Sequence, residues 1–236
     1  MKSKIAPLRS SDLVRSAVRA IDRMIATGKL QPNDRIVESE IGAILGMSRV
    51  PVREATRILA GEGVLELTPE RGARVREVTV ESAIDALKLL IGFSSMGLDD
   101  AVQHPSFDTN AQQLSLLSEA IVAHAKPSAD QPIFPDVGLY HQSLIVFSGN
   151  RLLSMSSEKI RFSHYYTMIG KLIDQDTMRQ CAQLYPDMTE SFLHHDTGHI
   201  RGVMATILKS MLTAITAGRQ VGDLNSRPEK SKKGSG

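Results

Sequence analysis

Three arginines recur at every fourth position between Ser48 and Glu66, in a segment whose other residues favour a helix. Arg49, Arg53 and Arg57 should therefore share one helix face, within about 80° of rotation. The opposite side should pack on a core, through Val52, Ala55, Ile58 and Leu59. Guanidinium groups placed in this way can donate paired hydrogen bonds to guanine and can neutralise phosphates. An arginine face is also common on ordinary solvated helices, so the spacing alone leaves both interpretations open.

The elements around the arginine segment indicate a helix-turn-helix. A shorter helix is predicted over residues 38–45, and Gly46 to Ser48 then form a three-residue turn. Ser48 can cap the arginine helix, and Pro51 falls in its first turn, where a missing N–H costs nothing. An amphipathic helix is also predicted over residues 11–27, from its apolar residues at positions i, i+3, i+4 and i+7.

A β-hairpin is predicted directly after the arginine helix. The stretches "VLEL" and "ARVREV" alternate apolar and polar residues, and "TPERG" between them has turn composition. Arg71 and Gly72 lie at the tip, where glycine lets the backbone approach a groove of DNA. Three helices followed by a hairpin make a winged helix-turn-helix.

This context favours DNA binding over a solvated face. A recognition helix meets base edges near its N-terminus, which is where Arg49 and Arg53 lie. Ser48 and the first N–H groups of the helix can hold a phosphate, and Arg35 can contact the DNA backbone.

Composition sets broad bounds on the 236-residue chain. It is 42% hydrophobic but only 4% aromatic, with no Trp, a composition that suits helices. Residues 1–80 hold 14 Lys/Arg and 10 Asp/Glu, whereas residues 81–236 hold 14 and 16, so the basic excess lies at the predicted DNA-binding end. A single cysteine, no apolar segment after the basic N-terminal residues and no long apolar run predict a cytoplasmic protein without a membrane span.

Residues beyond Val78 show no strand-like alternation, and they predict an all-α bundle of about six helices. The fold class is therefore mainly α, with a winged helix-turn-helix before a helical bundle. The predicted domains are residues 1–78 and 79–218, followed by a disordered tail over 219–236. The predicted helices in the bundle cover residues 79–102, 111–125, 136–148, 152–173 and 188–217, the last broken or bent near Gly198 or Gly202.

The stretch "DRIVESEIGAILGMSRVPVREATRILAGEGVLELTPERGARV" resembles the DNA-binding domain of the GntR family of bacterial transcription regulators. The residues that carry this resemblance are the "SR-x-PVREA-x-R-x-L" core, the following "EG" and the "RG" of the wing. The helical remainder is similar to the FCD effector domain of the FadR-type subgroup, through "HQSLIVFSGNRLL".

The resemblance implies a homodimer on a pseudo-palindromic operator, more often repressing than activating. It also implies a small carboxylate metabolite, bound in the helical domain, that controls operator affinity. Carried onto matching positions, it assigns DNA contacts to Arg35, Arg49, Arg53 and Gly72, with Ser48 and Arg71 as neighbours. Arg57 joins them on the arginine face.

Three histidines are the candidates for the effector pocket: His141, His195 and His199. Metal-binding members of the subgroup carry Asp four residues before the helix histidine, where this chain has Val137. His195 and His199 have the i, i+4 spacing of two ligands on one helix, so a zinc or nickel ion held by the three histidines is an alternative to a metal-free pocket.

Two other classes of function stay open at this point. A helical metal-dependent enzyme would have to use the histidine cluster, since the sequence has no phosphate loop and no nucleophile elbow. A protein-interaction module would keep the winged helix for partners alone. Neither predicts salt-dependent binding to duplex DNA.

Overall fold

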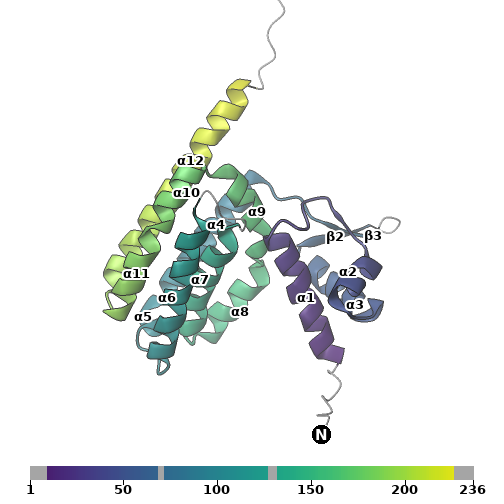
Figure 1. Ribbon diagram of the computed structural model, residues 1–236, viewed down its shortest axis with the longest axis horizontal. Helices are drawn as coiled ribbons and strands as arrows, with labels where there is room; N and C mark the ends of the chain where they lie inside the picture. Colours follow the sequence, from purple (N-terminus) through teal and green to yellow (C-terminus); the bar gives the residue numbers. More distant parts are fainter. Residues whose placement is uncertain (1–9, 69–71, 127–131, 226–236) are drawn as a thin grey trace, which may run out of the picture.

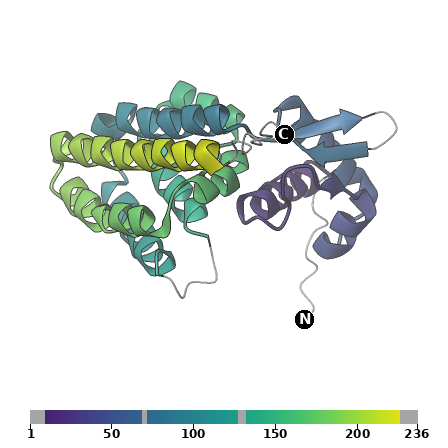
Figure 2. The same cartoon turned by 90° about the horizontal axis from the view of Figure 1, so that it is seen from above.

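The computed structural model describes residues 10–68, 72–126 and 132–225 (Figures 1 and 2). The winged helix-turn-helix and the helical bundle lie side by side, with the first helix facing the bundle. The predicted fold class is confirmed.

The helix-turn-helix has the predicted elements. Gly46 adopts the left-handed conformation, with φ of 63°, and its N–H bonds back to Ala43 and so ends the second helix. Ser48 occupies the N-cap position of the third helix in extended conformation. The three helices are α1 (Ser10–Ala26), α2 (Glu38–Leu45) and α3 (Arg49–Gly61).

The wing is a three-stranded antiparallel sheet in the order β1-β3-β2. β2 (Leu65–Thr68) and β3 (Gly72–Val75) form the predicted hairpin, with Thr68 opposite Gly72. β1 (Arg35–Ile36) adds an unpredicted edge strand, pairing Arg35 with Arg74. Two residues are too few to show a period of two, so sequence patterning cannot find this strand.

The apolar side of α3 packs on α1 and on the sheet. Val52, Ala55 and Leu59 are fully buried against Ile21 and Leu65, within one hydrophobic cluster. Ile58, predicted for the same face, is 41% exposed. It lies at the margin of that face, so it is only partly covered.

The second hydrophobic cluster belongs to the bundle. Nine helices follow the wing in the described residues, more than the six or so predicted. They are α4 (Val80–Met96), α5 (Leu98–Ala101), α6 (Phe107–His124), α7 (Phe134–Phe147), α8 (Arg151–Ile160), α9 (Ser163–Leu172), α10 (Gln175–Ala182), α11 (Leu184–Leu193) and α12 (Thr197–Asn225).

Local breaks explain the extra helices. The segment predicted as one helix over 152–173 is divided at Arg161, whose φ of 49° ends α8. The segment predicted over 79–102 is divided at Gly97, where a β-carbon would lie 2.8 Å from that of Ser148. Asp174 caps α10, accepting a hydrogen bond from the Thr177 N–H at 2.8 Å, between the predicted helices 152–173 and 188–217.

Helix α12 extends further than predicted. It runs to Asn225, because no proline interrupts the sequence before Pro228, so the predicted tail from residue 219 begins as helix. Residues 226–236 lie outside the described part. Thr197–Gly218 of α12 is long and apolar enough for a membrane span by length and composition. Of this window, 33% is buried inside the structure, and Ile200, Ile207 and Ile215 are among its buried side chains.

Polar side chains join the winged helix-turn-helix to the helical bundle. Arg161 makes a two-point ion pair with Glu62, the residue that ends α3, through Nε at 2.7 Å and Nη2 at 3.0 Å. Ser163 donates to Asp22 on α1 at 2.5 Å, and Thr167 donates to the Ile25 carbonyl at 3.0 Å. The start of α9 is thereby tied to α1 and to the end of the arginine helix.

Candidate nucleic-acid interface

One cavity of about 390 Å³ gathers most of the predicted DNA contacts. It opens between α2, α3 and the wing, and Leu67 and Thr56 form part of its wall. The predicted residues that line it are Arg35, Arg49, Arg53, Arg57 and Gly72.

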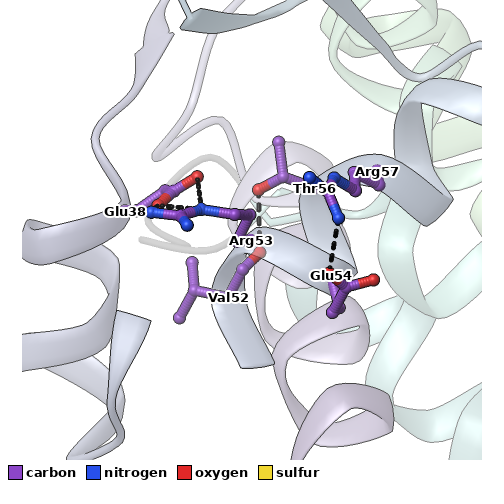
Figure 3. A network of polar contacts seen from close by, with 6 residues as sticks. All are labelled: Glu38, Val52, Arg53, Glu54, Thr56 and Arg57. Carbon is purple, nitrogen blue, oxygen red and sulfur yellow. Dashed lines mark hydrogen bonds and ion pairs between the residues drawn. The ribbon is translucent and has the colours of Figure 1, made fainter. Parts of the chain in front are cut away.

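Arg53 is held by a carboxylate from the neighbouring helix (Figure 3). Its Nε lies 3.2 Å and 3.0 Å from the two oxygens of Glu38, and its Nη2 lies 3.0 Å from Oε2. Glu38 is the first residue of α2, where the helix dipole also stabilises its negative charge. This hydrogen bond raises the pKa of Arg53 further above its ordinary value.

The other two helix arginines are held less firmly. Arg57 bonds Glu54 at 2.8 Å, three residues back on the same helix, and both side chains are largely exposed (Figure 3). An exposed pair of this kind contributes about 0.5 kcal/mol or less, so DNA can displace it. Arg49 forms no ion pair or side-chain hydrogen bond within the described ranges and faces solvent.

Arg35 and Gly72 meet where β1 pairs with β3. A β-carbon on Gly72 would lie 3.9 Å from the Arg35 Nε, so the arginine lies over the end of the wing. Gly72 has φ of 73°, a conformation that favours glycine. Arg71 lies outside the described residues. The Ser48 hydroxyl makes no capping bond to α3, which leaves it available to a phosphate.

Sequence reasoning missed two residues at this face. From the sequence, Glu38 could be recognised only as an acidic residue in the first turn of a helix. Its contact with Arg53 depends on how α2 and α3 cross, which the sequence does not show. Val50, beside Arg49, is 65% exposed. An exposed apolar side chain at the start of a recognition helix can contact the methyl group of thymine. The signal available in the sequence was an apolar residue at a position that the helical period places outside the buried face.

His141 lies in the bundle core and has both ring nitrogens bonded. Nδ1 lies 2.9 Å from the Ser94 hydroxyl, and Nε2 lies 3.0 Å from the Tyr185 hydroxyl. Ser94 donates its hydrogen to the Ile91 carbonyl, so Nδ1–H donates to Ser94 and Nε2 accepts from Tyr185. Burial lowers the pKa of His141 to about 4, so the ring is neutral near pH 7.

The three histidines do not form the predicted ligand set. His195 has φ of 57° and lies between α11 and α12, so the expected i, i+4 face of one helix does not exist. Its ring stacks on Phe107, with centroids 4.4 Å apart, and His199 bonds Asp187 at 2.9 Å on the surface. No group of three His, Cys, Asp or Glu side chains within the described ranges is arranged to hold a metal ion. These residues do not fit a zinc or nickel centre.

The fold and the arginine-lined face together define a winged helix-turn-helix DNA-binding protein. Residues 13–75 match the family described as "Bacterial regulatory proteins, gntR family". This match spans α1, the helix-turn-helix and the wing.

Known proteins are similar to this chain beyond the DNA-binding domain. The uncharacterized HTH-type transcriptional regulator YdhC of Bacillus subtilis is 21% identical over 203 residues, 78% of this chain and 89% of that protein. A probable D-xylose utilization operon transcriptional repressor of Paenarthrobacter nicotinovorans is 29% identical over 130 residues, 55% of this chain and 56% of that protein. The solved structure of E. coli McbR/YncC has a TM-score of 0.71 at 20% identity, covering 89% of this chain and 98% of that one, a likeness of fold.

Residues 13–75 therefore match the DNA-binding domain of GntR-family regulators, and the relatives that match along more of the chain are named as transcription regulators. The family match and the named relatives indicate a regulator rather than an enzyme.

Proposed function

We propose that this regulator is a repressor of the FadR-type subgroup that acts in the cytoplasm, binding a pseudo-palindromic operator as a homodimer. The observation that carries the proposal is the convergence of Arg35, Arg49, Arg53 and Arg57 on one cavity beside the wing. The name of the Paenarthrobacter relative supports repression. A dimer is required because one winged helix reads too few base pairs to select a genomic site.

The roles of the contacts follow from their positions. Arg49 and Arg53, in the first half of α3, read base edges in the major groove. Arg35, Ser48 and Arg57 hold phosphates, and Arg71 and Gly72 bring the wing to the minor groove. The FCD-like domain over residues 79–218 supplies the dimer contact, and Leu89 and Met96 are the exposed apolar side chains of α4 that it could use.

Replacing Arg35 with Ala should weaken binding to all DNA sequences alike. Without this phosphate contact, binding releases fewer counterions from the DNA. The slope of the logarithm of the binding constant against the logarithm of the salt concentration should therefore become shallower by about 0.9. Fluorescence anisotropy on a labelled duplex between 50 and 200 mM salt measures this. A parent protein whose binding to duplex DNA does not depend on salt would instead favour the protein-interaction module or the enzyme.

We further propose that a small organic acid controls operator affinity from the cleft between the two domains. This cleft of about 630 Å³ lies between α1, α7 and α9, and Arg19 and Arg23 line it one helical turn apart. Neither arginine forms an ion pair in the described part of the chain. The two acids on its wall are already bonded, Asp22 to Ser163 and Asp136 to His124, each at 2.5 Å.

The charges favour this cleft over a pocket at His141. His141 is neutral near pH 7 and sealed by Ser94 and Tyr185, so it offers a carboxylate no charge. A ligand in the cleft contacts both domains. The affinity of the protein for this ligand therefore changes when α1 moves relative to α9, so the ligand favours one arrangement of the two helices. The Arg161–Glu62 pair then carries that difference to the end of α3.

Replacing Arg19 and Arg23 together with Ala should abolish release of operator DNA by an acidic effector, while DNA affinity without effector stays near that of the parent. A panel of sugar acids and of di- and tricarboxylic acids, scored by loss of anisotropy, identifies the effector with the parent protein. Arg15→Ala is the matched control, since Arg15 lies one turn earlier on α1 and pairs with Asp12 instead. Release that persists in the double variant but disappears in His141→Gln would return the site to the bundle core.

A further inference from the structure

Glu38 has no role in the contacts assigned above, yet it makes the strongest side-chain contact at the arginine face. Its carboxylate accepts three close contacts from one guanidinium, and its side chain is 29% exposed. The pair joins α2 to α3 across 15 residues of sequence, so it is held by the packing of two helices. The Arg57–Glu54 pair, by contrast, is a single contact within one helix turn.

The geometry divides the donors of Arg53 between two edges. A guanidinium has a side edge, formed by Nε and one Nη, and an end edge, formed by the two Nη atoms. Glu38 occupies the side edge, through Nε and Nη2. The end edge remains for a second planar acceptor, and a guanine presents O6 and N7 in that arrangement.

The charge of Glu38 acts in the same direction. An unpaired arginine at a DNA surface is drawn to the nearest phosphate, which binds it without regard to sequence. A carboxylate bonded to Arg53 neutralises that attraction and repels phosphates, whereas a guanine edge carries no full charge. Glu38 therefore weakens sequence-independent contacts of Arg53 and leaves the base contact favourable.

We propose that Glu38 is the positioning residue that makes Arg53 a base reader rather than a phosphate anchor. This inference rests on the proposed function, in which α3 reads the operator. It predicts that specificity, the ratio of the dissociation constants for unrelated and operator DNA, depends on Glu38 although Glu38 itself need not touch DNA.

The test compares two substitutions at this position. Glu38→Gln removes the charge, and Glu38→Asp keeps the charge and the acid at the start of α2 but shortens its reach. Both should lower the specificity ratio by about tenfold, within the range for one paired base contact. Only Glu38→Gln should also tighten binding to unrelated DNA. The probes are a duplex enriched from a random library by the parent protein and a duplex of the same length with the operator sequence scrambled.

Two controls separate this role from a general effect of charge. Glu40→Gln removes an acid two residues away on α2 whose side chain has no partner in the described residues, so the ratio should stay unchanged. In an Arg53→Ala background, Glu38→Gln should have no further effect on the ratio. Circular dichroism at matched temperature checks that each variant is folded.

Several results would overturn the proposal. They are an unchanged ratio in both Glu38 variants, an equal fall in Glu40→Gln, and an effect of Glu38→Gln that persists without Arg53. These outcomes are distinct from failure of the proposed function, in which the parent protein enriches no duplex at all.

Discussion

Replacing Arg49 and Arg53 together with Ala should lower operator affinity by about 30-fold to 10⁴-fold, because each paired contact to a base contributes about 1–3 kcal/mol. Both side chains are exposed, and neither belongs to the hydrophobic cluster that holds α3 on α1, so the domain should stay folded. Binding to unrelated duplex DNA should fall much less. Titrations of operator and scrambled duplexes at one salt concentration measure both effects.

The charge-conserving variant, in which both arginines become Lys, is the matched control. Lysine keeps the positive charge but lacks the planar fork that pairs with guanine. This variant should keep most of its affinity for unrelated DNA and its salt dependence, yet lose most of the preference for the operator. Operator binding as tight as that of the parent would mean that neither arginine makes a paired base contact.

Acid should destabilise the folded chain between pH 6.5 and about 4. Burial lowers the pKa of His141 to about 4, and burial together with the charge of Arg76 lowers that of His164 to about 4. In this window the unfolded chain binds more protons than the folded one, so stability is complete above pH 6.5 and falls as pH falls. From an unfolded pKa near 6.5, each histidine should cost about 2 kcal/mol at pH 5.

Urea unfolding at pH 7 and pH 5, followed by circular dichroism, measures this loss. His141→Gln should be less stable at pH 7, because it loses bonds to Ser94 or Tyr185, but should lose about 2 kcal/mol less between the two pH values. His199→Gln is the opposing control. The bond to Asp187 raises the pKa of His199, so this group gains stability as pH falls and its removal should steepen the loss. An unaltered difference in His141→Gln would mean that His141 does not titrate in this way.

The N-terminal elements could be predicted from sequence because their signals are local. Gly46 and Ser48 mark the helix ends by backbone conformation alone, and the period of the apolar residues in α3 separates a buried face from an arginine face. The same reasoning placed Ile58 on the buried face, where it is only partly covered.

Features that depend on tertiary contacts were missed. The break at Arg161 accompanies an ion pair with Glu62, 99 residues earlier, and no local residue type announces it. The predicted ligand pair of His195 and His199 required both residues to lie on one continuous helix, and the left-handed conformation of His195 interrupts that helix. Glu38 could not be assigned for the same reason, since its partner is set by the crossing of two helices.

The most direct measurement of the central claim is selection of operator DNA by the full chain from a random duplex library, followed by hydroxyl-radical footprinting. The account predicts enrichment of an inverted repeat and two protected half-sites about one helical turn apart, with enrichment lost in the Arg49→Ala, Arg53→Ala variant. Failure to enrich any sequence, or equal enrichment by that variant, would contradict the claim that α3 reads an operator.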